Sequence, residues 1–229
     1  MRVLLKISGE ALSGGKGFGF DEQMLHRVAE IVKELIHNKH QVGIVVGAGN
    51  FIRGAEVKNI DRCIADNMGM LAININALAL FDYLQKKGIK SRNLNSFAID
   101  GVADRFNKPK AEKFLDNGGV IIFGGGTGNP FFTTDTAGVL RALEIEADLM
   151  IKATKVDGLY DKDPEKYDDA KFIKSSTYGE ILEKDYKVMD LAAIALAKSN
   201  NLKLKIVSLF KQGAILNAVN GDDEGTVIH

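Results

Sequence analysis

Several features that would assign a chain of 229 residues to a particular class are scarce or missing. The only cysteine is Cys63, which excludes an internal disulfide and a zinc site built from paired cysteines. Only three prolines occur, and no Pro- or Ser-rich linker interrupts the sequence. We therefore expect a single domain that spans residues 1–229.

An excess of charge of one sign is also missing, because 30 Lys and Arg residues balance 30 Asp and Glu residues. A dedicated nucleic-acid binder has a basic surface, so we expect no nucleic-acid partner. The 45% of apolar and 26% of charged residues are typical of a folded globular protein and argue against disorder. With zero net charge, a stable oligomer or a small-ligand role fits better than a scaffold.

Long hydrophobic runs are missing as well. The N-terminal segment MRVLLKISGE has only three consecutive apolar residues before Lys6, which is too few for a signal peptide. The longest apolar stretch, Met68–Phe81, contains Asn74 and Asn76 and is too short to cross a bilayer. We expect a cytoplasmic protein without a membrane partner.

Short β-rich runs alternate with stretches of helical periodicity along the whole chain. This alternation is typical of a mostly parallel sheet with helices on both faces. Asp21 is suited to cap the first long helix, in which Leu25, Val28 and Val32 share one face. The expected strands are Arg2–Ile7, Gln41–Val46, Val120–Phe123, Leu149–Lys152 and Leu204–Val207, and the expected helices are Asp21–Ile36, Asp66–Gln85, Lys108–Leu115, Thr134–Glu146 and Asp190–Ala197.

Glycines gather directly after the expected strands, at Ser8-Gly9, at Gly47-Ala48-Gly49 and at 124–128. Ligands of open parallel sheets bind beyond the carboxyl ends of the strands, where helix N-termini offer free N–H groups. Three such turns in one chain indicate a phosphate site. For any one turn, an ordinary tight strand-to-helix connection is the alternative.

Familiar phosphate-binding motifs do not match these turns. A Walker A loop fails near Lys16, because Gly17 stands where the motif needs Ser or Thr. A dinucleotide motif begins well at Gly47 and Gly49, but Ile52 replaces its third glycine. No GxSxG, HExxH or EF-hand pattern occurs, and we expect no metal site built from side chains.

Two cations are candidates to bind the phosphates. Lys6 ends the first expected strand, so its ammonium group should lie at the same sheet edge as the glycine turns. A lysine there provides a point charge for a phosphoryl group. Arg53 follows Gly49 by four residues, and its planar fork suits bidentate phosphate binding. Ordinary surface cations are the alternative for both.

The third glycine cluster continues into GTGNPFFTTDTAG, which is rich in hydroxyl, amide and aromatic side chains. Thr133 to Thr136 open a helix, so some of these hydroxyls can cap it. Capping does not account for so many short hydrogen-bonding side chains beside Phe131 and Phe132. The segment therefore predicts a pocket for a flat, polar ring.

Six segments, in order and covering nearly the whole chain, resemble the bacterial-type uridylate kinases of the amino-acid-kinase family. They are KISGEAL, VVGAGNFIRG, DNMGMLA, GTGNPFFTTD, KATKVDGLYDKDP and KVMDLAA. The pair GTGNPFFTTD and KATKVDG is specific to that group, whereas KISG with a glycine-rich second turn marks the broader family. The resemblance implies an α/β fold, a three-layer αβα sandwich around a mostly parallel sheet of about eight strands.

The resemblance also implies phosphorylation of UMP to UDP by ATP, a step of pyrimidine nucleotide biosynthesis, with Mg²⁺ as cofactor and a homohexameric assembly. The N-terminal part would hold mainly the acceptor UMP, and the C-terminal part mainly the ATP nucleoside. The implied catalytic residues are Lys6, Arg53, Lys152 and Asp190. The implied ATP-binding residues are Lys6, Ile7, Ser8, Gly9, Gly49, Arg53, Thr154, Tyr160 and Asp163. The implied UMP-binding residues are Ala48, Asp66, Thr127, Gly128, Asn129, Pro130, Phe131, Phe132, Thr133 and Thr134.

Several of these assignments have alternatives or depart from the family. Many relatives have glycine in place of Ala48 and phenylalanine in place of Tyr160. Asp66 could instead be a helix N-cap, and so could Asp190, whose other role would be to orient Lys6. A segment that takes part in activation by GTP in some relatives matches Gly14, Gly15, Lys16, Gly17, Phe18 and Gly19, which could equally form a mobile loop. Inhibition by UTP is a further expectation from the family.

The implied reaction needs no general base, because the acceptor phosphate is largely ionised at neutral pH, its second pKa being about 6. The difficulty is electrostatic, since two polyanions must approach in line, and catalysis should consist of positioning and charge neutralisation. Two other functions stay open: a kinase of the same fold that acts on a carboxylate or carbamate, and a nucleotide-binding module without catalytic activity.

Overall fold

The computed structural model describes residues 1–229 and is built on a sheet of nine strands. The strands of this sheet, in spatial order, are β4 (Asp104–Arg105), β3 (Ser91–Asn95), β5 (Val120–Gly124), β2 (Gln41–Val46), β1 (Arg2–Ile7), β6 (Leu149–Thr154), β10 (Leu204–Ser208), β11 (Thr226–Ile228) and β9 (Ser175–Ser176). All neighbouring strands are parallel except β10 and β11. A separate hairpin pairs β7 (Leu159–Tyr160) with β8 (Phe172–Ile173).

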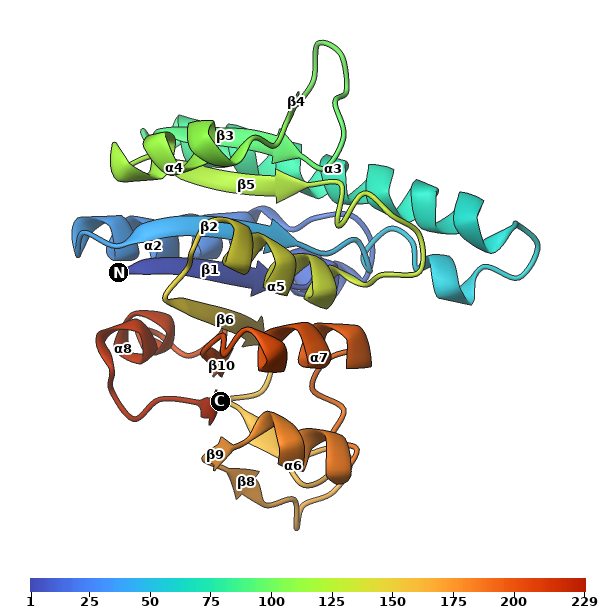
Figure 1. The fold of residues 1–229 in the computed structure, drawn as a ribbon, viewed down its shortest axis with the longest axis vertical. Coiled ribbons are helices and arrows are strands. Elements are labelled where there is room, and N and C mark those ends of the chain that lie inside the picture. Colours follow the sequence, from blue (N-terminus) through green and yellow to red (C-terminus); the bar gives the residue numbers. More distant parts are fainter.

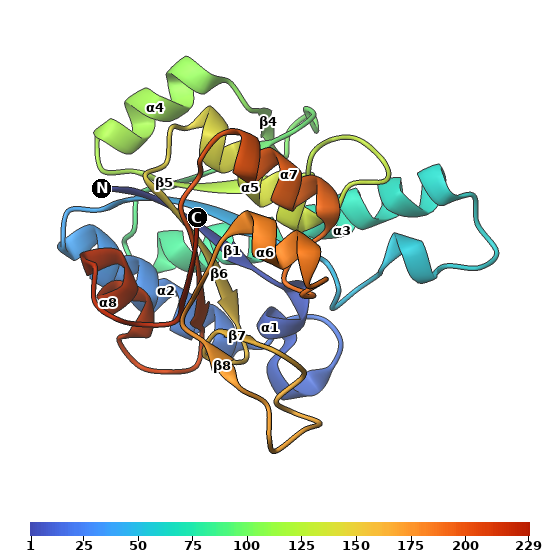
Figure 2. The same cartoon turned by 60° about the horizontal axis from the view of Figure 1, so that its bottom comes forward.

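Helices cover both faces of the sheet, which confirms the expected layered α/β fold (Figure 1). One face carries α1 (Gly9–Ser13), α2 (Glu22–His37), α3 (Arg62–Lys86) and α8 (Ala214–Asn220). The other face carries α4 (Lys108–Asp116), α5 (Thr134–Glu144), α6 (Tyr178–Glu183) and α7 (Leu191–Ser199). Figure 2 shows the two helix layers with the sheet between them. Two short 3₁₀ turns, η1 (Gly14–Lys16) and η2 (Gly54–Glu56), follow α1 and the second glycine turn.

The central strand β1 is apolar on both faces because each face meets a helix layer. Val3 and Leu5 point into the core beneath α2 and α3, while Leu4 points into the core beneath α5. All three side chains are fully buried. Burying each of them contributes about 1.5–3 kcal/mol, so the two cores hold this strand firmly in the middle of the sheet.

Helix α3 is longer than the sequence pattern indicated. It begins at Arg62, because the N-cap is Asp61, whose Oδ1 accepts hydrogen bonds from the backbone N–H groups of Cys63 and Ile64. Asp66 therefore lies within the helix, which excludes the N-cap alternative for it. At 25 residues the helix also has the length and mean hydropathy of a membrane span, by length and composition only. A helix that packs on a protein core has the same properties, and α3 covers one face of the sheet.

The other expected strands and helices are present within a few residues of their expected bounds. The sequence pattern missed β3, whose residues Arg92, Asn93 and Asn95 interrupt the apolar pattern. It also missed the short helices α1, α6 and α8. The sheet has nine strands rather than about eight, because the two-residue strands at its edges add to the count.

Candidate active site

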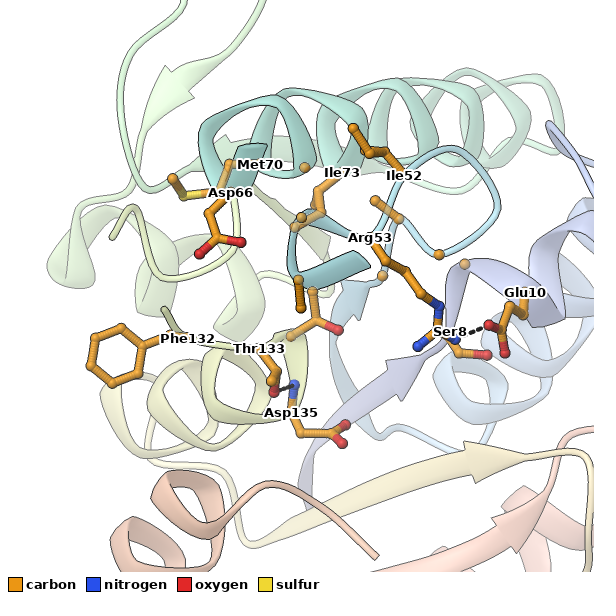
Figure 3. A pocket seen from close by; sticks show the side chains of 18 of the residues that line it. Ser8, Glu10, Ile52, Arg53, Asp66, Met70, Ile73, Phe132, Thr133 and Asp135 are labelled. Carbon is orange, nitrogen blue, oxygen red and sulfur yellow. Dashed lines mark hydrogen bonds and ion pairs between the residues drawn. The ribbon is translucent and has the colours of Figure 1, made fainter. Parts of the chain in front are cut away.

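A cavity of about 330 Å³ opens beyond the carboxyl ends of β1 and β2, beside the first half of α3 (Figure 3). Two of the three predicted glycine turns line it, at Gly9 and at Gly47 to Gly49, whereas the third turn, at 124–128, does not. Side chains that face this cavity come from four separate segments of the chain. They are Lys6, Ser8, Glu10, Ile52, Arg53, Arg62, Asp66, Met70, Ile73, Asn129, Phe132, Thr133, Thr134 and Asp135.

The first two glycine turns touch each other, and this contact explains why they need glycine. A Cβ on Gly9 would lie 2.7 Å from the backbone nitrogen of Gly49. A Cβ on Gly47 would lie 2.9 Å from the backbone nitrogen of Gly9. Without side chains, the backbone N–H groups of both turns come close together at one end of the cavity, an arrangement that suits an anion. Ala48 lies buried in the second turn.

Lys6 and Lys152 share one buried carboxylate at the floor of the site. Lys6 Nζ lies 2.6 Å from Asp135 Oδ1, and Lys152 Nζ lies 2.7 Å from Asp135 Oδ2. The two lysines are direct neighbours on adjacent parallel strands, β1 and β6. Lys152 also donates a hydrogen bond to the backbone carbonyl of Val188. Both lysines were expected at the site, whereas Asp135 was expected only as part of the start of a helix.

Burial and the neighbouring charges together shift the pKa values of Asp135 and Lys152. Burial alone would raise the pKa of Asp135, but the adjacent Lys6 and Lys152 charges outweigh it and hold the pKa below its ordinary value. Burial lowers the pKa of Lys152, and the Lys6 charge lowers it further, while Asp135 opposes both effects. The cluster thus carries two buried cations and one carboxylate, which leaves a positive charge for a phosphoryl group.

Asp190 lies close to this cluster but does not contact Lys6. Its Oδ1 caps α7 by accepting a 3.0 Å hydrogen bond from the backbone N–H of Ala193. It also accepts hydrogen bonds from the hydroxyls of Thr133 and Thr136, at the start of α5. Asp190 therefore joins α5 to α7, and Asp135 is the carboxylate that orients Lys6. Thr133 is the N-cap of α5, as the sequence analysis allowed.

Arg53 reaches over the same cavity from the opposite side (Figure 3). It precedes η2 with an extended backbone. Its guanidinium forms an ion pair with Glu10 and lies 3.7 Å from Glu56. The side chain is about half exposed, at 48%, so the guanidinium is available to an anion that displaces Glu10.

Asp66 faces the far end of the cavity from α3 (Figure 3). Its Oδ2 accepts a 2.8 Å hydrogen bond from the backbone N–H of Phe131 and another of 2.8 Å from Arg62 Nε. Arg62, which lies one helical turn before Asp66, was not expected from the sequence. Of the expected acceptor residues, Asn129, Phe132, Thr133 and Thr134 line the cavity, whereas Thr127, Gly128, Pro130 and Phe131 do not.

A second cavity, of about 600 Å³, lies beyond the carboxyl end of β6. Three residues expected at an ATP site line it, namely Thr154, Tyr160 and Asp163. The Tyr160 hydroxyl donates a hydrogen bond to Asp157, and its ring packs edge-on against Phe172. Lys152 lines this second cavity, whereas Lys6 and Asp135 line the first. The lysine cluster thus lies between the two cavities. Ile7, by contrast, is a core residue whose side chain reaches neither cavity.

The segment from Gly14 to Gly19 lines neither cavity, although it is tied to the second glycine turn. The backbone N–H of Gly19 donates to the carbonyl of Asn50, and Asn50 Nδ2 donates back to the carbonyl of Gly19. The ring of Phe18 packs edge-on against that of Phe51. A role of this segment in GTP activation stays a prediction.

Residues 1–208 match the model of the Amino acid kinase family. The chain belongs to this family. Among its curated relatives are a uridylate kinase of Psychromonas ingrahamii, 49% identical over 99% of this chain and 92% of the relative, and one of Haemophilus ducreyi, 46% identical over 99% and 97%. These matches cover nearly the whole chain, whereas the KISG turn that marks the broader family covers only a few residues.

Solved structures extend the family fold to the last residues of the chain. A UMP kinase of Bacillus anthracis is 36% identical with a TM-score of 0.95, over 100% of this chain and 95% of that one. A UMP kinase of Ureaplasma parvum is 33% identical with a TM-score of 0.92, over 100% and 98%. The family fold therefore includes β11 and α8, although the family match ends at residue 208.

Proposed function

We propose that the protein transfers the γ-phosphoryl group of ATP to UMP and releases ADP and UDP. The observation that carries this proposal is the position of the Lys6–Asp135–Lys152 cluster between two cavities. The curated relatives named uridylate kinase and the solved UMP kinases, each matching the chain over nearly its full length, support the same reaction.

In this proposal the N-terminal part of the chain binds the acceptor, and the C-terminal part binds the ATP nucleoside. UMP occupies the end of the first cavity near Asp66, whose carboxylate accepts hydrogen bonds from ribose hydroxyls. Ala48 contributes its backbone, and the segment from Thr127 to Thr134 surrounds uracil. The ATP nucleoside occupies the second cavity, where Tyr160 offers an aromatic face, and the ATP phosphates lie along the glycine turns.

The chain's residues act by positioning and charge. Lys6 neutralises the transferring phosphoryl group, because Asp135 holds its ammonium between the two cavities. The guanidinium of Arg53 releases its ion pair with Glu10 and binds the incoming phosphates instead. Lys152 stabilises the leaving phosphate from the side of the second cavity. The acceptor oxygen needs no general base, since the phosphate of UMP is already largely ionised.

We propose Mg²⁺ as the cofactor that accompanies ATP. No group of three His, Cys, Asp or Glu side chains comes together in the chain, and Asp135 is occupied by two lysines. This donor set fits a metal that keeps several waters and binds mainly through substrate phosphates. Bound in this way, Mg²⁺ supplies further charge neutralisation to the phosphates.

An exposed apolar stripe on α3 supports the proposal of a homohexamer. Ile64, Met68, Leu71 and Ile75 follow one another at helical spacing and are 38–54% exposed. A continuous apolar stripe of this kind is typical of a protein–protein interface, and a second copy offers the same stripe to pack against. We also propose a cytoplasmic location and allosteric regulation, as in the family that the sequence resembles.

A substrate panel tests the proposal against its alternatives. Purified protein is mixed with Mg²⁺ and ATP, and ADP release is followed with UMP, CMP, dUMP, glutamate and carbamate in separate reactions. We expect turnover with UMP far above that with the other acceptors, and its loss on chelation of the metal. Turnover with glutamate or carbamate instead would assign a different kinase activity. ATP binding without turnover would favour a nucleotide-binding module.

A further inference from the structure

Phe131 has an unusual backbone conformation at the point where it contacts Asp66. Its φ is +72°, in the left-handed region that a bulky side chain rarely adopts. The backbone N–H donates a 2.8 Å hydrogen bond to Asp66 Oδ2. A strained residue of this kind persists only where its surroundings hold it, and here α3 provides the holding group.

Arg62 completes the same contact. Its Nε donates a 2.8 Å hydrogen bond to the same Oδ2, and its guanidinium lies 5.5 Å from the centre of the Phe131 ring. The ring itself is 65% exposed, so the core does not fix it. Arg62 and Phe131 are therefore linked in two ways. Both donate a hydrogen bond to the same oxygen of Asp66, and the guanidinium of Arg62 lies over the ring of Phe131.

These contacts leave the two oxygens of Asp66 in different situations. Oδ2 accepts two hydrogen bonds from the protein, whereas Oδ1 accepts none. Oδ1 lies against Gly54, where an added Cβ would come within 2.2 Å of it. The carboxylate is thus fixed in one orientation, in which Oδ1 is the oxygen left for a ligand of the cavity that Asp66 and Gly54 line.

We propose that Arg62 and Phe131 form a latch on Asp66 that sets how strictly the acceptor site requires a ribose hydroxyl. Arg62 is a positioning residue: it orients Asp66 and holds the loop of residues 127–133, part of which lines the acceptor cavity. The inference rests on the proposed function and goes beyond it, because it assigns substrate discrimination to a residue outside the phosphate machinery.

Two variants test the latch in kinetics. Arg62→Met keeps the aliphatic length but removes the donor and the charge, whereas Arg62→Lys keeps a donor and the charge. We expect Arg62→Met to raise the KM for UMP about tenfold, the size expected for one charge-assisted hydrogen bond. The kcat and the KM for ATP should stay within about twofold. The preference for UMP over dUMP should fall, because a loosely held carboxylate discriminates less well. Arg62→Lys should show smaller changes than Arg62→Met, both in the KM for UMP and in the preference for UMP over dUMP.

The matched control is Lys86→Met, which breaks an ion pair of the same i,i+4 spacing at the other end of α3. Lys86 Nζ lies 2.6 Å from Asp82 Oδ2, and both side chains are exposed. This variant should leave both KM values and the preference for UMP unchanged. If Lys86→Met gave the same changes as Arg62→Met, the effect would belong to the helix as a whole, and the latch would be refuted.

Hydrogen exchange tests the latch without any substrate. The amide hydrogens of the peptide covering residues 127–133 should exchange faster in Arg62→Met than in the unmodified protein or Lys86→Met, because the N–H of Phe131 loses its ordered acceptor. Unchanged exchange with an unchanged preference for UMP overturns the latch. Absence of turnover with UMP in the unmodified protein would instead refute the proposed function, and the exchange comparison alone would then decide whether the latch exists.

Discussion

Lys6 and Lys152 lie directly opposite each other on adjacent parallel strands, and both contact the carboxylate of Asp135. Two ammonium groups this close repel each other, and burial makes the repulsion stronger than it would be in water. One carboxylate between them offsets it only in part. The cluster is therefore electrostatically prepared for a further anion, which makes its three members the most informative positions to change.

Replacement of Lys6 by alanine should lower kcat by about 10³-fold or more, because the charge that faces the transferring phosphoryl group is lost. Binding of UMP should stay nearly intact, since Asp66 and the loop that follows Gly126 remain in place. Steady-state kinetics and UMP titration measure the two effects separately. Lys33→Ala, on the exposed side of α2, serves as the control. An equal loss of turnover and UMP binding would mean that Lys6 has a structural role.

The lowered pKa of Lys152 predicts an alkaline limit to activity. Burial and the Lys6 charge favour the neutral amine, so Lys152 loses its proton below the ordinary value near 10.5. The profile of kcat/KM, which reports groups of the free enzyme, should therefore fall as the pH rises toward that value. Lys152→Arg stays charged, and should move the fall to higher pH. A fall that stays at the same pH in this variant would assign it to another group.

Asp135→Asn should destabilise the fold by about 3 kcal/mol at pH 7, because two buried cations lose their counter-charge. The sign of the pH dependence follows from the lowered pKa of Asp135. Its stabilisation is fully present above the ordinary pKa of an aspartate and is lost as the pH falls through the lower pKa of the folded state. In urea unfolding, the free energy of unfolding of Asp135→Asn should thus lie below that of the unmodified protein at neutral pH, and the difference should narrow as the pH is lowered.

The control for this measurement is Asp82→Asn, which breaks an exposed pair with Lys86. Exposed pairs contribute about 0.2–1 kcal/mol, so this variant should change the free energy of unfolding little at any pH. A gap for Asp135→Asn that is no larger than the gap for Asp82→Asn would contradict the account of the buried cluster.

Asp66→Asn should raise the KM for UMP more than it lowers kcat, because a contact with the ribose exists in the ground state as well as in the transition state. The amide keeps an oxygen that can accept the N–H of Phe131, so the loop retains part of its support. Initial rates over a range of UMP concentrations measure both constants. A large decrease of kcat with an unchanged KM would exclude the ribose assignment.

Much of the fold could be predicted from the sequence because its central strands are apolar on both faces and its long helices are periodic. The strand β3 could not, since Asn95 is polar and yet fully buried. Its place in the sheet depends on β5, to which it pairs over five residues. Pairing between distant segments overrides the local preference of such a segment.

The candidate site also has residues that could be predicted from the sequence and residues that could not. Lys6 and the glycine turns could be predicted because a strand end followed by glycine is a local pattern. Asp135 and Arg62 could not, because their roles depend on contacts with residues distant in the sequence or on where a helix begins. The register that places Lys6 beside Lys152 exists only once β1 pairs with β6. Similarly, the place of Asp66 inside α3 follows from the cap at Asp61.

The outermost strands of the sheet, β4 and β9, have two residues each. Strands this short leave few backbone N–H and C=O groups free along the sheet edges, where a foreign strand would otherwise attach. Neighbouring molecules therefore find only a short template, the part of β3 that β4 does not pair with, for an intermolecular sheet. The consequence is protection against fibrous aggregation in a protein whose net charge of zero gives it little colloidal repulsion.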